Sequence, residues 1–263
     1  MISATMKPGM ASKLPGLSRW AAVWLLTLLL GWLGGCAAVP GEGDNRADPW
    51  ESFNRHTFAF NEAMDRAVIK PAAQVYQAVV PSVARTGVNN FFGNLGDLWT
   101  SANLLLQVKP QAALEMGMRA GINTLFGLGG ALEVAEDLGL ARIASEDFGQ
   151  TLGYWGLGSG PYLVLPLLGP STLRDATGLV LDLKDSPSSR LWQEPRDKNP
   201  ANLLQVLNAR VKLLNVSQLL DDIALDKYVL LRDAFLARRK SLIYDGEPPD
   251  GDAAPAPYKS LLR

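Results

Sequence analysis

Apolar side chains recur every three or four residues along much of the chain, which is the period of an amphipathic helix. The first such face comprises Phe53, Thr57, Phe60 and Met64, and continues to Ala67 or Val68. Asp48 precedes it as a possible helix cap, with Pro49 at the first helical position and Glu51 at the third. The pattern therefore predicts a helix that begins at residues 48–49. Pro71 and Pro81 then bracket a short predicted helix over residues 72–79.

The second half of the chain predicts two more helices. Asn199 is placed to cap one, with Pro200 in its first turn and an apolar face made of Leu204, Leu207, Val211, Leu214 and Gln218. The other runs from about residue 226 to residue 243, with basic residues near its C-terminal end. The proline-rich residues 185–200 are predicted to form a loop. No clear period-two alternation is present, so the predicted fold is mainly α.

Three segments carry no charged residue: 98–108, 120–132 and 148–173. The last resembles a transmembrane segment in charge alone, but its six glycines and three prolines exclude one continuous helix. In a water-soluble core it predicts two short buried strands or helices joined by a glycine turn. In a membrane it predicts a re-entrant hairpin held by protein or lining a wet cavity. The segment alone leaves both interpretations open.

Composition favours a membrane-associated protein over a nucleic-acid-binding one. Hydrophobic residues make up 48% of the chain and charged residues 19%, which is below the roughly 25% typical of soluble domains. The formal net charge is -1. Residues 1–35 hold three basic and no acidic residues, so their removal leaves 22 basic and 26 acidic ones. Nothing here provides the basic face that nucleic acid requires.

The N-terminus has the organisation of a lipoprotein signal peptide. Lys7, Lys13 and Arg19 precede a 14-residue apolar run over residues 20–33, which suits a secretory signal rather than a spanning helix. The next residues, Leu33-Gly34-Gly35-Cys36, resemble the bacterial lipobox, whose cysteine is lipidated and becomes the first residue of the mature chain. Cys36 is the only cysteine. We therefore predict a signal peptide over residues 1–35, lipid attachment at Cys36 and a polar tether over 36–47; an uncleaved anchor is the alternative.

Catalytic motifs fail on inspection, so we predict no enzyme activity, no metal and no cofactor. His56 is the only histidine and lies among charged neighbours, and a zinc site would lack ligands. The surroundings of Ser159 and Ser171 both depart from the Gly-x-Ser-x-Gly elbow of lipases. Residues 127–130 are too short for a nucleotide-binding fingerprint. A lipid-modifying hydrolase is accordingly disfavoured.

Taken together, a series of short motifs resembles the MlaA (VacJ) lipoprotein family. The motifs are Asp48-Pro49-Trp50-Glu51-x-Phe53-Asn54-Arg55, Phe58-x-Phe60-Asn61, Asn90-Phe91-Phe92-x-Asn94-Leu95, Asn103 to Gln107, Asn123-Thr124-x-x-Gly127-x-Gly129-Gly130, Phe148-Gly149-Gln150-Thr151-Leu152-Gly153, Gly158-x-Gly160-Pro161-Tyr162, Leu173-Arg174-Asp175 and Tyr228-x-x-x-Arg232-Asp233-Ala234-Phe235. The resemblance covers roughly residues 48–240. It divides the mature chain into a helical domain over residues 48–244 and a tail over 245–263 that we expect to be disordered.

The resemblance implies both a fold and a task. The expected fold is a ring-like helical bundle embedded in one membrane leaflet, on the periplasmic side of the outer membrane, with glycine-rich hairpin segments. Its central channel would remove mislocalised glycerophospholipids from the outer leaflet and pass them to a periplasmic carrier, MlaC, which feeds an inner-membrane ABC transporter. A trimeric outer-membrane porin is the expected partner. The alternative function is that of a structural, porin-associated lipoprotein without transport activity.

Uncharged polar residues within the apolar segments are the candidate channel lining, because they can face a headgroup at a lower desolvation cost than ions. The candidates are Asn103, Asn123, Thr124, Gln150 and Thr151, with Arg174 as a partner for phosphate. An equally good interpretation of Arg174 is a structural pair with Asp175. Three alternating glycines before Pro161 form the candidate gating hinge, because glycine changes its backbone angles easily: Gly156, Gly158 and Gly160.

Overall fold

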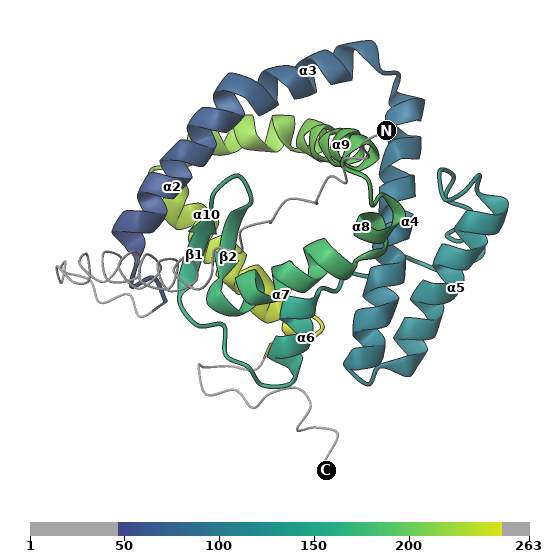
Figure 1. The fold of residues 1–263 in the computed structure, drawn as a ribbon. Coiled ribbons are helices and arrows are strands. Elements are labelled where there is room, and N and C mark those ends of the chain that lie inside the picture. Colours follow the sequence, from purple (N-terminus) through teal and green to yellow (C-terminus); the bar gives the residue numbers. More distant parts are fainter. Residues whose placement is uncertain (1–46, 249–263) are drawn as a thin grey trace, which may run out of the picture. The chain divides into compact units, whose positions relative to one another are not determined.

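A computed structural model describes residues 47–248, which all lie within one compact unit, Asn45–Arg263. The predicted signal peptide, Cys36, nearly all of the tether and most of the predicted C-terminal tail lie outside the described residues. The elements of this unit are helical except for one two-stranded sheet (Figure 1). The mainly α prediction is therefore confirmed. Within residues 47–248, no helix has both the length and the apolar character needed to cross a membrane.

The first three helical elements run on from one another. Helix α2 (Glu51–Met64) passes into a π-helical turn, η2 (Asp65–Ile69), and then into α3 (Lys70–Val79). Pro71 was expected to break the helix, and that prediction was wrong. Proline lacks an N–H and its ring crowds the carbonyl one turn earlier. The π-helical turn that precedes Pro71 is wider than an α-helical one and accommodates the proline without ending the helix.

The next two helices pack side by side. Helix α4 (Ser82–Leu106) follows Pro81, and α5 (Pro110–Phe126) begins after a tight reversal (Figure 1). The predicted segment over residues 98–108 is thus the last part of α4 and the reversal, not a separate element. A loop after α5 returns to α4, where Asn90 Nδ2 donates a hydrogen bond to the Ala131 carbonyl oxygen at 3.2 Å.

The uncharged segment over residues 148–173 folds as a short helix followed by a β-hairpin. Helix α6 (Phe148–Tyr154) is capped by Asp147, whose carboxylate accepts from the Gln150 backbone N–H at 2.8 Å. Strands β1 (Tyr162–Leu165) and β2 (Gly169–Thr172) pair antiparallel, with Tyr162 opposite Thr172. The short helix and the two short strands joined by a turn match the first of the two predicted arrangements, and a re-entrant position in a membrane stays a prediction. Alternation over four residues per strand was too short to recognise in the sequence.

The C-terminal part is helical throughout: α7 (Leu173–Asp185), α8 (Pro187–Leu191), α9 (Pro195–Ile223) and α10 (Lys227–Ile243). The predicted helix over about residues 226–243 is confirmed as α10, and Asp226 caps it by accepting from the Val229 N–H. The loop expected over residues 185–200 is wrong, because α8 and the start of α9 occupy it. Helix α9 begins at Pro195 and continues through Pro200, so Asn199 is not its cap. Trp192, just after α8, packs against Phe91 and Phe92 of α4.

Contacts among these elements connect the two halves of the unit. Helix α9 packs on α3 and α4, α6 packs on α4, α7 and α10, and the hairpin lies against α2 and α10. The interior they enclose is unusually polar: among residues 47–248, nineteen buried residues are polar or charged and eleven are hydrophobic. Many large apolar side chains are exposed instead. This reverses the usual distribution, in which Leu, Ile and Val are buried and charged residues are not.

Candidate functional site

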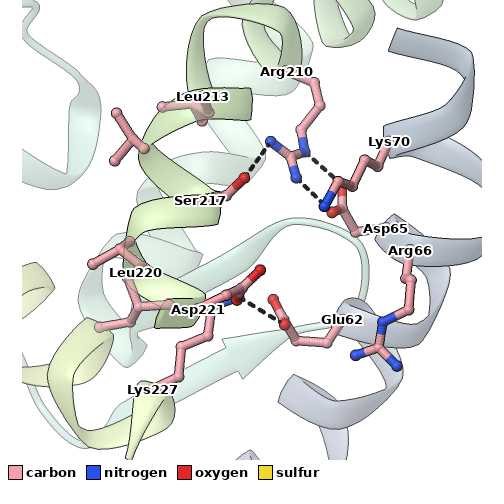
Figure 2. A pocket seen from close by; sticks show the side chains of 12 residues that line it. Glu62, Asp65, Arg66, Lys70, Arg210, Leu213, Ser217, Leu220, Asp221 and Lys227 are labelled. Atoms are coloured by element: carbon pink, nitrogen blue, oxygen red, sulfur yellow. Dashed lines mark hydrogen bonds and ion pairs between the residues drawn. The ribbon is translucent and has the colours of Figure 1, made fainter. Parts of the chain in front are cut away.

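A pocket of about 450 Å³ lies between the α2–η2–α3 helix and the pair α9–α10. Four basic side chains, three carboxylates and several leucines and a valine line it (Figure 2). Arg210 forms a two-point ion pair with Asp65, with nitrogen–oxygen distances of 2.7 and 2.8 Å. Lys227 contacts both Glu62 at 2.8 Å and Asp221 at 2.7 Å. The hydrogen bonds to Asp65 raise the pKa of Arg210 above its usual value. The pocket was not foreseen, because its walls come from helices about 145 residues apart in the chain.

Two asparagines of α2 hold the hairpin. Asn54 is fully buried; its Nδ2 donates to the Tyr162 carbonyl oxygen at 3.0 Å, and its Oδ1 accepts from the Val164 N–H at 2.9 Å. One heptad later, Asn61 repeats this arrangement with the Leu165 carbonyl at 2.9 Å and the Leu167 N–H at 2.7 Å. The two side chains thus bond the free edge of β1 as a neighbouring strand would.

Asp48 joins three parts of the unit. Its carboxylate accepts hydrogen bonds from Asn54 Nδ2 at 2.8 Å and from the Tyr228 hydroxyl, and Arg232 lies 3.3 Å from it. Asp48 is buried, and α2 begins after Trp50 without a side-chain cap, so the predicted capping role is wrong. Both asparagines and Asp48 belong to the motifs noted in the sequence. The roles of the asparagines were missed because their partners are backbone atoms more than 100 residues away. The role of Asp48 was missed because Tyr228 and Arg232 lie 180 and 184 residues away in the chain.

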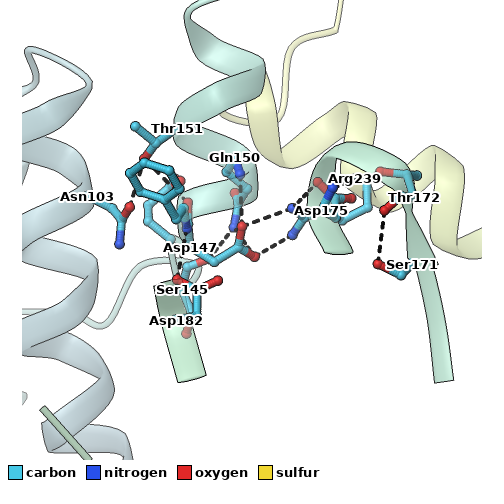
Figure 3. A network of polar contacts seen from close by, with 12 residues as sticks. Asn103, Ser145, Asp147, Gln150, Thr151, Ser171, Thr172, Asp175, Asp182 and Arg239 are labelled. Atoms are coloured by element: carbon cyan, nitrogen blue, oxygen red, sulfur yellow. Dashed lines mark hydrogen bonds and ion pairs between the residues drawn. The ribbon is translucent and has the colours of Figure 1, made fainter. Parts of the chain in front are cut away.

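Four of the six candidate lining residues meet around α6 and α7. Thr151 donates to Asn103 Oδ1 at 2.8 Å, and Gln150 Nε2 donates to the Ser145 carbonyl at 2.9 Å. Arg174 contacts Asp175 at 2.7 Å, so the structural pairing is present. Gln150 Oε1 is buried and has no hydrogen-bond partner among the described residues. Figure 3 shows this network with Asn103, Gln150, Thr151 and Asp175 drawn as sticks.

Arg239 of α10 is the centre of the same network. It forms two-point ion pairs with Asp147, the cap of α6, and with Asp175 of α7. Burial alone would raise the pKa of Asp147, but the hydrogen bonds and charge of Arg239 outweigh it and lower that pKa below its usual range. Three elements are therefore fastened through one guanidinium.

At the neighbouring carboxylate, Glu146, the effect of burial on the pKa outweighs that of hydrogen bonds and charges. Glu146 is buried and accepts a hydrogen bond from Gln107 Nε2 at 2.9 Å. Burial raises the pKa of Glu146 above its ordinary value, and the Gln107 hydrogen bond offsets only part of the rise. Gln107 also lies 3.3 Å from the Thr151 hydroxyl, which connects this carboxylate to the candidate lining residues.

The other two candidates belong to a separate cluster between α4 and α5. Asn123 is buried; its Oδ1 accepts from the Val134 and Ala135 N–H groups, each at 2.8 Å. Thr124 is exposed, and its hydroxyl accepts from Asn94 Nδ2 at 2.8 Å. The structure thus does not bring all six together. A channel-lining role for them stays a prediction, and in this structure most of their polar atoms bond to other protein groups.

The three hinge glycines differ from one another. All lie in an exposed stretch between α6 and β1. Gly156 and Gly160 have φ angles of +96° and +65°, a region that favours glycine, whereas Gly158 is outside it. A Cβ added at Gly160 would lie 3.2 Å from Leu173 Cβ, and one added at Gly158 would meet nothing within 4 Å. Gly158 is therefore free of packing constraints.

Large exposed apolar side chains occur on most elements of the unit, and two groups of them are defined by their place in the fold. The hairpin tip presents Leu167 and Leu168, each 59% exposed. The second group, which we call the α4–α5 apolar end, lies where the N-terminal part of α4 meets the C-terminal part of α5 and the loop after it. It consists of Leu125, Phe126, Leu128 and Leu132, all exposed. Such patches mark surfaces that contact a partner or a membrane.

Comparison with known proteins resolves the family. Residues 46–242 match the family model described as MlaA lipoprotein. The chain belongs to this family. It is 35% identical over 233 residues to proteins of Shigella flexneri and Escherichia coli (strain K12), each named intermembrane phospholipid transport system lipoprotein MlaA; the match covers 87% of the chain and 90% of each relative.

A solved structure described as "Structural basis for maintenance of bacterial outer membrane lipid asymmetry" superposes with a TM-score of 0.67 at 34% identity. The match covers 75% of this chain and 99% of that one. The resemblance inferred from the motifs is thereby confirmed. The distinctive asparagines, glycines and buried charges described above are thus features of an MlaA lipoprotein.

Proposed function

We propose that this protein is a lipid-anchored phospholipid transporter of the outer membrane that maintains lipid asymmetry. It takes mislocalised glycerophospholipids from the outer leaflet and hands them to a periplasmic carrier of the MlaC type. It catalyses no reaction. Support comes from the names of its relatives, which describe intermembrane phospholipid transport, and from the description of the similar solved structure.

The observation that carries the proposal is the reversed distribution of polar and apolar residues. The hairpin tip and the α4–α5 apolar end expose leucines and a phenylalanine, while the interior of the unit is rich in buried polar groups. Hydrocarbon tolerates such an exterior and penalises exposed polar groups. We infer that the unit lies in the periplasmic leaflet, with lipid around its apolar surfaces, and that a trimeric porin covers part of them.

The anchor is Cys36, whose acyl chains would hold the unit at the membrane, since two or more chains give stable attachment. Within the unit, Gly158 and its neighbours Gly156 and Gly160 supply the hinge, and the polar residues Asn103, Asn123, Thr124, Gln150, Thr151 and Arg174 are the proposed lining. The hinge lies directly before the hairpin, so a change there would move β1 against Asn54 and Asn61.

Deleting the gene in its own host tests the proposal. Outer-leaflet phospholipid, measured by surface labelling, should rise and return to normal when the wild-type protein is restored. Cys36→Ala should fail to restore it, and mass spectrometry of the mature wild-type N-terminus should find an acylated cysteine. Unchanged surface phospholipid in the deletion strain would refute transport, and an unmodified Cys36 would refute the anchor.

A further inference from the structure

Within the pocket between α2–η2–α3 and α9–α10, two cations are left over after the internal ion pairs are formed. Arg210 is paired with Asp65, and Lys227 is shared by two carboxylates. Arg66 and Lys70 also line the pocket, yet within residues 47–248 their side chains form no ion pair and no hydrogen bond. The four basic and three acidic side chains give the pocket a net charge of +1.

The geometry suits a ligand that is anionic at one end and apolar at the other. Arg66 and Lys70 project from consecutive turns of one helix, at the π-helical segment and just after it, where such segments often mark functional sites. Across the pocket, α9 contributes Leu213, Val216 and Leu220. A volume of about 450 Å³ accommodates a headgroup with its glycerol and the first acyl carbons.

We propose that this pocket is a binding subsite for the phosphodiester of a glycerophospholipid, held by Arg66 and Lys70 with its glycerol against the α9 leucines. Guanidinium and ammonium groups form charge-assisted hydrogen bonds with phosphate oxygens. The net charge of +1 favours a monoanionic phosphate over a neutral lipid. The inference rests on the proposed transport function, and it names the residues that hold the headgroup.

The test measures binding of dihexanoyl-phosphatidylglycerol to the full lipidated protein in non-ionic detergent, by titration calorimetry below the micelle concentration of the lipid. Arg66→Gln combined with Lys70→Gln should weaken binding by about tenfold or more. The charge-preserving pair Arg66→Lys and Lys70→Arg should retain most of it. The matched control, Arg196→Gln with Lys198→Gln, removes two cations of α9 outside the pocket and should bind as the wild type does.

Two additional ligands separate the possible sources of phosphate. Dihexanoylglycerol, which lacks phosphate, should not bind, and inorganic phosphate at equal concentration should not displace the lipid. Displacement by inorganic phosphate would identify a free-phosphate site and overturn the proposal, as would unchanged lipid binding by the Gln double variant. Transport by the wild-type protein between vesicles separates a failure of the subsite from a failure of the proposed function. Transport without binding in this pocket refutes only the subsite, whereas the absence of transport refutes the proposed function.

Discussion

At the scale of single residues, buried charges determine how the helices of this unit are joined. The Asp175 carboxylate accepts hydrogen bonds from Arg174 at 2.7 Å and from Arg239 at 2.8 Å, and all three side chains are mostly buried. Buried pairs add little net stability, but removing one partner leaves an uncompensated charge. Arg174 therefore has a structural task whether or not it also meets phosphate.

This arrangement predicts a large effect of Arg174→Glu on folding. The change adds a third carboxylate to Asp147 and Asp175, which share Arg239, and should lower the free energy of unfolding by about 3–5 kcal/mol. Arg190→Glu is the matched control, because Arg190 is 69% exposed in its pair with Asp185 and should change stability by less than about 1 kcal/mol. The melting temperatures of both variants, measured by thermal unfolding, test this prediction. A normal melting temperature for Arg174→Glu together with lost transport would instead favour a phosphate-binding role.

The raised pKa of Glu146 predicts that the effect of Glu146→Gln on stability depends on pH. Because burial raises its folded-state pKa above the ordinary value near 4.5, its ionised form destabilises the fold at neutral pH. Glu146→Gln should therefore raise the melting temperature at pH 7 by a few degrees. The gain should disappear at pH 4.5 and below, where the wild-type carboxyl is protonated. A gain of the same size at both pH values would show that charge is not the cause.

At the scale of elements, the helical pattern was readable in the sequence where packing agreed with local preference. The helical character of α2 and the bounds of α10 followed from the spacing of apolar residues, although Phe53 and Phe60 of the predicted apolar face of α2 are exposed. The positions of Pro71 and Pro200 led to wrong helix boundaries. A π-helical turn precedes Pro71, and Pro200 lies in the second turn of α9, so neither proline ends its helix. The hairpin could not be placed, since the edge of β1 bonds to two side chains of a distant helix.

That attachment gives a prediction for Asn61. Leu167 at the hairpin tip has a φ of +63°, which is strained for leucine, and its N–H donates to Asn61. Asn61→Ala removes both hydrogen bonds to the hairpin and should cost about 1–2 kcal/mol. Hydrogen exchange at the Leu167 amide should accelerate clearly. Gln111→Ala, which removes only an exposed contact with Glu115, is the control and should leave that amide unchanged. Equal protection in both variants would contradict the role of Asn61.

The hinge glycines call for separate substitutions. Gly160→Val forces a positive φ on a β-branched residue and should destabilise the fold by about 1 kcal/mol or more. Gly158→Val meets open space, so it should stiffen the loop and lower lipid transport while circular dichroism and porin pull-down stay normal. Undiminished transport by folded Gly158→Val would exclude the hinge.

At the scale of the whole molecule, the family and its task were accessible from the order of short motifs, whereas the site was not. Candidate lining residues were chosen as uncharged polar groups in apolar segments. The fold uses most of them for internal hydrogen bonds, as with Asn123 and the Val134 and Ala135 amides. The pocket with Arg66 and Lys70 depends on helices that only the fold brings together.

Reconstitution of the lipidated protein in vesicles, with a purified carrier of the MlaC type as acceptor, tests the central claim most directly. The account predicts that intact phospholipid reaches the acceptor only when the protein is present, and that no fatty acid is released. Released fatty acid would reveal a hydrolase. Phospholipid that stays in the vesicles, despite folded and porin-bound protein, would indicate a scaffold and contradict the account.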